Sequence, residues 1–438
     1  MFLIKLFEKK YFSYLIIILL LIFSFYRSPH LFLEGRFWGE DGSYFFQNAI
    51  NNDFFENFFK IYEPTAGYYN LFPRLAALIA NSFPIEFAPL VSVYLSYIII
   101  FYIFLLTIFS NSFLVENKKQ KFLLCFLILF CSSFVPEVWV NTVNAQIYFG
   151  VLSILILYSK NNSSVIFKIV NNVTLFIGGF STSYVVVLFP FFIIKYYLCK
   201  TKNFLINSLV VTFSFLFQLF FYLNTKKSLN MIDVNRDNAF LNKLSFEMID
   251  FYYLQVLIYN VFLKTLFSKP IILQLKRFVD YFFINKLFLI GCIIISLFFI
   301  LIFIYLIIQN LKKSREKIII LYSLWAIFIT ILTMNILVSG SFIFGRYASI
   351  LGFTFALTFL YLSFQNYKNF FLKKLINVFL ILIYLTGIYQ FRPNNYQIYF
   401  LDCLDNCKPW KEQIMSNTDY IILWPYNTGY DWRLMLNK

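Results

Sequence analysis

Histidine is almost missing from this sequence, which contains one, His30, in 438 residues. A histidine-centred metal site needs several imidazole groups. A Ser-His-Asp triad that is assisted by a second histidine needs two. Both kinds of site are therefore disfavoured. The chain also has no Walker loop and no dinucleotide-binding fingerprint. Their absence excludes ATP-driven transport powered by this chain itself.

Charged residues are also scarce, at 13% of the chain against 60% apolar residues. A soluble core could not bury so much apolar surface, so the composition indicates an integral membrane protein. Because unpaired backbone groups are costly in lipid, the long apolar segments must cross as helices. The sequence predicts an all-α polytopic protein with about 11 transmembrane helices. We place them at about residues 11–27, 89–110, 122–136, 146–159, 165–181, 183–199, 203–223, 283–309, 318–338, 347–364 and 375–391.

Acidic residues are nearly absent from the short segments that join alternate spans. These segments hold 18 basic residues and only three acids, which accounts for almost all of the net charge of +16. They lie around residues 5–10, 116–121, 160–168, 195–202, 312–317 and 368–374. This asymmetry is the positive-inside signature, so it predicts that the basic side is cytoplasmic. It gives no support to a nucleic-acid partner.

The predicted topology places three longer segments outside the cytoplasm, at residues 28–88, 224–282 and 392–438. The first span follows two lysines and lacks a small-residue cleavage site, so we expect it to be retained and the N-terminus to be cytoplasmic. Residues 1–391 are then a transmembrane domain. Residues 392–438 form a small external C-terminal cap.

Three local features refine this topology. Residues 71–83 and 251–267 mix apolar and polar positions, which predicts amphipathic helices in the membrane interface. Glycines and small residues at 178–183 predict a tight hairpin between two short spans. In the cap, Cys403 and Cys407 form either a disulfide or two free thiols, and their spacing favours neither.

The most pointed motif is FWGEDGSYF, at residues 37–45. Glu40 and Asp41 are adjacent carboxylates between two glycines, and aromatic rings on both sides could keep them in a region of reduced dielectric. Such surroundings raise the pKa of a carboxyl group and favour a general base. A solvated Asp-Gly turn is the alternative, which the spacing does not exclude.

Two arginines are candidates for binding phosphate. Arg74 lies in YEPTAGYYNLFPRLAAL, at residues 62–78, which also contains Tyr68, and Arg346 lies in FGRYASI. The predicted topology puts both on the side of Asp41. A planar guanidinium can donate two parallel hydrogen bonds to a phosphate or diphosphate headgroup. The alternative is an interfacial arginine that reaches the phosphates of ordinary lipids.

A third group lies in PEVWVNTVNAQIYF, at residues 136–149. It contains Glu137, Trp139, Asn141, Asn144 and Gln146. Amides offer hydrogen bonds and an indole ring offers a flat apolar face, so this combination is suited to binding a sugar. The same residues are also ordinary at the end of a helix, and both interpretations stand.

With these motifs in order, the chain resembles the GT-C class of polytopic membrane glycosyltransferases, and more closely a bacterial group of GT-C-like proteins with a W-x-E-D-G motif in the first loop. The resemblance rests on WGEDGSYF and AGYYNLFPRL, with weaker support from NAQIYFGVL, GFSTSYVVVLFP, GRYASILGF and the tail WPYNTGYDWRLML. It implies a bacterial cytoplasmic membrane protein, a sugar donor on a polyprenyl phosphate carrier and inversion at the sugar carbon.

The resemblance also implies roles for individual residues. Asp41, with Glu40 beside it, matches the acidic catalytic position of the first external loop, and Arg74 and Arg346 would steady the departing phosphate. Some members of the class bind a divalent metal through loop carboxylates, so a metal remains possible here. The expected function is transfer of a sugar to a surface glycan or glycolipid at the outer face of the cytoplasmic membrane.

Three other functions remain open, one of which is a purely structural membrane component. A transporter or flippase of lipid-linked sugars would need a polar path through the bilayer, whereas the centres of the predicted spans are nearly free of charge. An O-antigen polymerase or ligase would concentrate its essential groups in the later loop, around Asp233, Arg236 and Asp237.

Overall fold

The structure is a computed structural model of the whole chain. It describes residues 11–59, 69–131, 138–160, 164–229, 258–267, 271–272, 274, 315–339, 345–365, 370–391, 409–416, 419–423 and 432–435. The chain divides into two compact units. The first unit draws on Met1–Asn111, Pro136–Leu229 and Arg392–Lys438, and the second on Ser112–Val135 and Asn230–Phe391. The C-terminal segment thus belongs to the same unit as residues 28–88.

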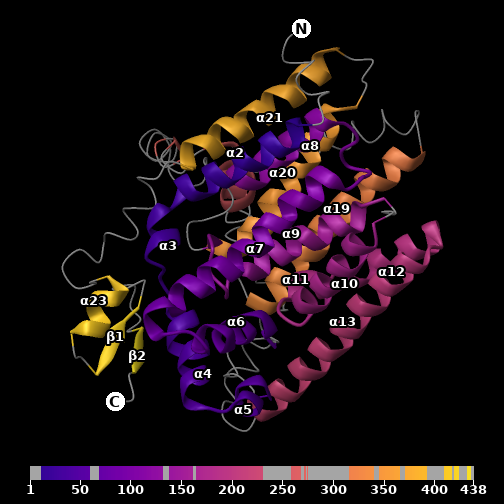
Figure 1. The fold of residues 1–438 in the computed structure, drawn as a ribbon. Coiled ribbons are helices and arrows are strands. Elements are labelled where there is room, and N and C mark those ends of the chain that lie inside the picture. Colours follow the sequence, from indigo (N-terminus) through magenta and orange to yellow (C-terminus); the bar gives the residue numbers. More distant parts are fainter. Residues whose placement is uncertain are drawn as a thin grey trace, which may run out of the picture. The chain divides into compact units, whose positions relative to one another are not determined.

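The first unit contains both long helices and short elements (Figure 1). Its N-terminal part consists of α2 (Phe12–Arg27), α3 (Pro29–Leu33), η1 (Asp41–Phe46), α4 (Gln47–Asn51), α5 (Phe54–Phe59), α6 (Leu71–Asn81), η2 (Ile85–Phe87) and α7 (Ala88–Phe109). Its later part consists of α9 (Ala145–Tyr158), α10 (Val165–Gly179), α11 (Ser183–Val186), α12 (Phe189–Cys199), α13 (Lys202–Leu229), α23 (Trp410–Met415), β1 (Tyr420–Ile422) and β2 (Arg433–Met435).

The second unit is helical in its described residues. They form α8 (Lys118–Phe130), η5 (Ile258–Leu263), α16 (Lys264–Leu266), α19 (Arg315–Ser339), η6 (Gly345–Ala348), α20 (Ser349–Ser363) and α21 (Phe370–Gln390). Helix α20 is buried along its length. Gly387 of α21 packs on α8 so closely that a Cβ there would lie 1.7 Å from the carbonyl oxygen of Phe130. Glycine is therefore required at this contact.

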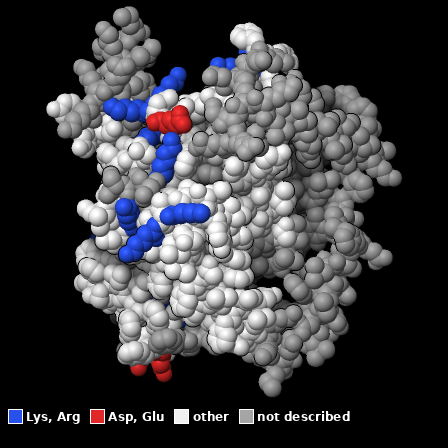
Figure 2. Space-filling model, turned by 90° about the vertical axis from the view of Figure 1, so that its right-hand side faces the viewer, with Lys and Arg blue, Asp and Glu red and all other residues white. Residues whose placement is uncertain are grey.

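The chain is a mostly helical, multi-pass membrane protein. Among the described residues, three helices are long and apolar enough to cross a membrane, at Ile85–Phe109, Lys202–Asn224 and Phe370–Gln390. A fourth span results if the bent pair of Val165–Gly179 and Ser183–Cys199 is counted as one. The predicted number of about 11 is not established by these helices. The predicted span at 283–309 lies outside the described residues. On the face drawn in Figure 2, most of the described surface is uncharged.

Helix α9 forms the interior of the first unit, because all of its residues are buried. A helix that is apolar on every side needs other helices around it, and α7, α10 and α11 supply them. Lys195 of α12 is also buried, and its Nζ atom donates hydrogen bonds to the carbonyl oxygens of Ile156 and Ser159, at 3.4 and 2.6 Å. This lysine, counted above with the basic flanks, satisfies carbonyls left unpaired at the end of α9.

The predicted hairpin at residues 178–183 is a sharp bend of 118° between α10 and the following helices. Its glycines allow close packing rather than an unusual backbone conformation. A Cβ at Gly178 would lie 2.9 Å from the ring of Phe149, and one at Gly179 would lie 2.4 Å from Ser214 Oγ. Small residues at the bend therefore let α10 approach both α9 and α13.

Helix α6 is packed inside the first unit, although its sequence predicted a helix in the membrane interface. Most of its residues are buried, and it contacts α7, η1 and α10. Its N-terminus docks on the bend, where the amide of Leu71 donates to Phe180 O at 3.1 Å and the amide of Phe72 donates to Ser181 Oγ at 2.8 Å. These contacts satisfy N–H groups that a helix cannot pair internally. The polar residue Arg74 of α6 thus faces protein, whereas Asn81 at the end of the helix is exposed.

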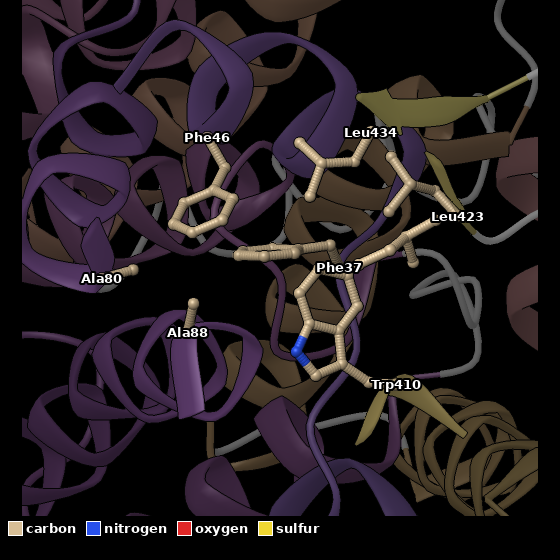
Figure 3. Packing of buried hydrophobic residues seen from close by; sticks show 8 residues of the cluster. Phe37, Phe46, Ala80, Ala88, Trp410, Leu423 and Leu434 are labelled. Carbon is tan, nitrogen blue, oxygen red and sulfur yellow. The ribbon is translucent and has the colours of Figure 1, made fainter. Parts of the chain in front are cut away.

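The C-terminal segment packs directly on the residues of the FWGEDGSYF motif. Strands β1 and β2 pair antiparallel, with Ile421 opposite Leu434. The cluster shown in Figure 3 joins both segments and consists of Phe37, Phe46, Ala80, Ala88, Trp410, Ile421, Leu423 and Leu434. The Gln47 side chain donates a hydrogen bond to Met435 O at 3.1 Å and accepts one from the backbone amide of Met435 at 2.6 Å. The cap therefore extends the core of the first unit.

Candidate functional site

Asp41 begins η1, a single turn of π-helix that is buried on one side. Such turns are rare and often occur at functional sites. The glycines of the motif are needed because the cap lies against it: a Cβ at Gly39 would lie 2.6 Å from the ring of Trp432, and one at Gly42 would lie 2.6 Å from Leu423. The turn and its glycines place Asp41 beneath the cap, where only 3% of the residue is exposed.

The Asp41 carboxyl group is held by a segment about one hundred residues later in the sequence. Its Oδ1 atom accepts a hydrogen bond from the amide of Val143 at 2.9 Å and another from the Thr142 hydroxyl. Its Oδ2 atom accepts from the amide of Thr142 at 3.3 Å. The alternative of a solvated Asp-Gly turn is wrong, because the side chain is buried and bonded to protein groups.

The segment that holds Asp41 has a strained backbone. Val140 has a φ of +44°, in the left-handed region that β-branched residues avoid. The Asn141 side chain accepts the amide of Asn144 at 2.8 Å, which turns the chain into α9. Together these features direct the consecutive amides of Thr142 and Val143 toward one carboxyl group. Backbone strain of this kind is retained where the surrounding structure enforces it, often at functional sites.

Burial raises the pKa of the Asp41 carboxyl group from its ordinary value of 3.8 to about 7. The hydrogen bonds from Thr142 and Val143 lower this pKa, and the neighbouring charge of Glu40 raises it, but loss of hydration has the largest effect. The group therefore changes charge near neutral pH. A carboxylate with such a pKa is suited to accepting and releasing a proton.

Glu40 precedes η1 and is only partly buried, unlike Asp41. The two neighbouring acids consequently have different surroundings. Asp41 faces the 138–144 segment, whereas Glu40 keeps some contact with solvent.

Arg74 lies in the same unit as Asp41, but the two do not form an ion pair. Arg74 is 1% exposed, donates to the carbonyl oxygen of Asn57 and lies 5.0 Å from the centroid of the Tyr69 ring. Ala77, one turn later on α6, packs in a cluster with Phe45 and Val143. Helix α6 thus brings Arg74 within about one helical turn of the cluster that flanks Asp41.

The predicted sugar-binding residues of the 138–146 segment are all buried. Trp139 is 3% exposed, Asn144 is fully buried and Gln146 is 5% exposed. Tyr148 covers one side of Trp139 with a ring-to-ring distance of 6.5 Å. None of the three presents an open surface to a sugar in this structure, and Asn141 serves as an ordinary helix-end residue.

Arg27 is a cation near the site that sequence reasoning missed. It ends α2, is 3% exposed, and its guanidinium carbon lies 4.2 Å from the centroid of the Trp139 ring. Trp139 is three residues before Thr142, so a buried cation lies beside the segment that holds Asp41. An arginine at the predicted outer end of a span, against the positive-inside pattern, was the signal for it.

The remaining predicted residues belong to the second unit or lie outside the described residues. Arg346 belongs to the second unit, where its guanidinium lies 5.4 Å from the Tyr347 ring centroid. Tyr68, Glu137 and the two cap cysteines Cys403 and Cys407 lie outside the described residues. Within the described ranges, no group of three His, Cys, Asp or Glu side chains is arranged to hold a metal ion.

We expect Thr142→Val to move the ionisation of Asp41 to higher pH. The hydrogen bond from the Thr142 hydroxyl lowers the pKa of Asp41. Valine has about the size of threonine but lacks this hydroxyl, so the pKa of Asp41 should rise. A hydrophobic carbodiimide reacts with the protonated carboxyl group, and mass spectrometry of the peptide that contains Asp41 measures the adduct against pH. Thr142→Ser, which retains the hydroxyl, should titrate like the wild type. Identical profiles for Val and Ser would contradict the assigned hydrogen bond.

Fold and site together define a multi-pass membrane protein with a buried, readily protonated carboxyl group. This group, Asp41, is bonded to Thr142 and Val143 in the unit that also contains the C-terminal segment. Comparison with protein-family models and with curated proteins finds no match for this chain.

Proposed function

We propose that this protein is a glycosyltransferase of the GT-C type that moves a sugar from a polyprenyl-phosphate-linked donor to a cell-surface glycan or glycolipid. The observation that carries the proposal is the buried carboxyl group of Asp41, which has a pKa of about 7. Asp41 belongs to the FWGEDGSYF motif in the predicted external segment 28–88. The predicted orientation of the chain places this group at the outer face of a bacterial cytoplasmic membrane.

In the proposed reaction Asp41 is the general base. It takes the proton of the acceptor hydroxyl as the acceptor oxygen bonds to the anomeric carbon of the sugar. The bond from that carbon to the carrier phosphate breaks, and the phosphate leaves with the electron pair. The transition state has oxocarbenium character, so carboxylates near the sugar also stabilise positive charge. Attack opposite the leaving group inverts the anomeric configuration, as the family resemblance implies.

Arginines of the first unit are suited to the leaving phosphate. Arg27 lies against Trp139 beside the segment that holds Asp41, and Arg74 lies one helical turn from Ala77, which packs on Val143. Guanidinium groups in reduced dielectric stabilise a developing phosphate charge strongly. We assign this role to Arg27 and Arg74 and retain Arg346 as a third candidate in the second unit.

The stability cost of Asp41 supports a functional role. A buried carboxyl group with a raised pKa destabilises the fold whenever it is ionised. The oxygen of an asparagine would accept the hydrogen bonds from the Thr142 hydroxyl and the Val143 amide, and the side chain would not ionise. Residues that reduce stability in this way are common in active sites.

A change in glycan composition tests the proposed function. Deletion of the gene should remove one sugar from a cell-surface glycan or glycolipid, and the wild-type gene should restore it, as measured by glycan mass spectrometry. An unchanged mass profile would contradict the proposal. If the sugar were lost because a lipid-linked sugar no longer crossed the membrane, the flippase alternative would hold. Vesicles containing the purified protein would then move that lipid without releasing polyprenyl phosphate.

A further inference from the structure

An amide with no place in the proposed reaction is buried among the helices of the first unit. Asn207 of α13 is fully buried, and neither its Oδ1 nor its Nδ2 atom has a hydrogen-bond partner. On α10, Asn172 donates from Nδ2 to Lys168 O at 2.9 Å, while its buried Oδ1 atom has no partner. Because unpartnered buried amides are costly, such groups are usually satisfied by protein or by ordered water.

The contact between Gly179 and Ser214 places both amides in register. A Cβ at Gly179 would lie 2.4 Å from Ser214 Oγ, so α10 and α13 touch at this pair. Asn172 precedes Gly179 by seven residues, and Asn207 precedes Ser214 by seven residues. Seven residues are almost two helical turns, so each amide projects from nearly the same side of its helix as the contact residue.

Helices α10 and α13 run in the same general direction, which the register argument requires. Contacts between α12 and α13 are antiparallel, because Phe189 stacks on Phe215 at 4.3 Å and Lys195 lies over Phe204 at 4.1 Å. The axis bends by 118° between α10 and α12. Figure 1 shows α10 beside α13. The two amides therefore lie toward the same end of this helix pair.

We propose that Asn172 and Asn207 bind one ordered water molecule between α10 and α13. The unpartnered atoms include two carbonyl oxygens, which accept hydrogen bonds, and one amide nitrogen, which donates them. The ligand must therefore both donate and accept. Water does so, whereas a metal cation cannot accept from the nitrogen and a lipid chain offers neither.

The site would hold α10 to α13 close to the bend on which α6 docks. Gln218 of α13 already donates to Gly179 O at 3.2 Å and accepts from the Tyr69 amide at 2.9 Å. The water site is a second polar connection between the same two helices, two turns away from the bend. Polar contacts between membrane helices each contribute modestly, so several are needed to fix one arrangement.

A double-mutant cycle tests the shared site. Thermal unfolding midpoints of the purified full chain in detergent would be measured for Asn172→Leu, Asn207→Leu and the double variant. Each single substitution should lower the midpoint, and the double variant should unfold near the lower single midpoint, because either change removes the water. The matched control is Asn203→Leu, one turn earlier on α13, which should combine additively with Asn172→Leu. Additive losses at 172 and 207, or a raised midpoint for Asn207→Leu, would overturn the proposal.

An experimental structure that resolves ordered water provides the second measurement. It should show density about 3 Å from both Asn172 and Asn207. A direct hydrogen bond between the two amides, or a dry contact, would overturn the assignment. If Asn207→Leu fails to fold, Asn207→Val replaces it in the cycle, since this smaller apolar side chain also removes both hydrogen-bonding groups.

Discussion

Asp41→Asn is expected to abolish sugar transfer while leaving the membrane protein folded. Asparagine matches the shape of aspartate, and its side-chain oxygen can still accept hydrogen bonds from the Thr142 hydroxyl and the Val143 amide. It cannot take the proton of an acceptor hydroxyl. Loss of a general base slows a reaction by about 10²- to 10⁴-fold. The modified glycan should therefore be absent from the mass profile of cells that carry this variant.

Asp53→Asn is the matched control for this experiment. Asp53 is an exposed acid in the same long segment, and its side chain accepts the Glu56 amide at 2.8 Å at the start of α5. Asparagine caps a helix about as well as aspartate, so neither folding nor transfer should change. Equal transfer by the wild type, Asp53→Asn and Asp41→Asn would remove Asp41 from the reaction. Equal loss in both variants would point to a general effect of charge.

The same Asp41→Asn substitution should stabilise the protein, and more so at alkaline pH. The pKa of Asp41 in the folded protein, about 7, is above the ordinary value of 3.8, so the folded state binds more protons than the unfolded state between these values. Its stability contribution is therefore lost as pH rises through this window. Above the pKa that Asp41 has in the folded protein, the ionised carboxyl group lowers the unfolding free energy by the full amount. Asparagine does not ionise, so it causes no such loss.

The expected difference is large enough to measure. Between about pH 5 and about pH 8, the gain in unfolding free energy from Asp41→Asn should grow by roughly 3 kcal/mol, since each unit of pKa shift corresponds to about 1.4 kcal/mol. Unfolding midpoints of both proteins in the same detergent at the two pH values would show it. A constant difference across this range would mean that Asp41 does not titrate as its burial requires.

The helices were largely predictable from sequence, because their cause is local. Apolar runs that cannot remain in water gave the positions of α7, α13 and α21 directly, and small residues at 178–183 predicted the bend. The number of spans could not be read in the same way. Helix α9 is as apolar as a span yet is surrounded by protein, and length and hydropathy do not distinguish these two environments.

The site was predictable only in part. The motif that contains Glu40 and Asp41 was recognisable, but its burial depends on the amides of residues 142–143 and on a C-terminal segment nearly four hundred residues away. No local pattern encodes such contacts. Trp432 explains why residue 39 must be glycine, and this could not be seen before the two segments were placed together.

The arginines show the limit of reasoning from charge and position alone. Arg74 was selected for its place in a motif, and α6 does bring it near the Asp41 cluster, although buried rather than at the membrane surface. Arg27 was passed over as the end of an ordinary span, because its contact with Trp139 joins residues more than one hundred positions apart. Long-range packing decides which cation lies beside the acid.

Release of polyprenyl phosphate by the purified protein tests the central claim most directly. Wild type and Asp41→Asn would be reconstituted in vesicles with a polyprenyl-phosphate-linked sugar and a glycolipid acceptor from the native membrane, and the free carrier would be quantified by mass spectrometry. We predict release by the wild type and about 10²-fold less or lower by the variant at equal folded amounts. Equal release by both proteins would contradict the assignment of Asp41 as the base.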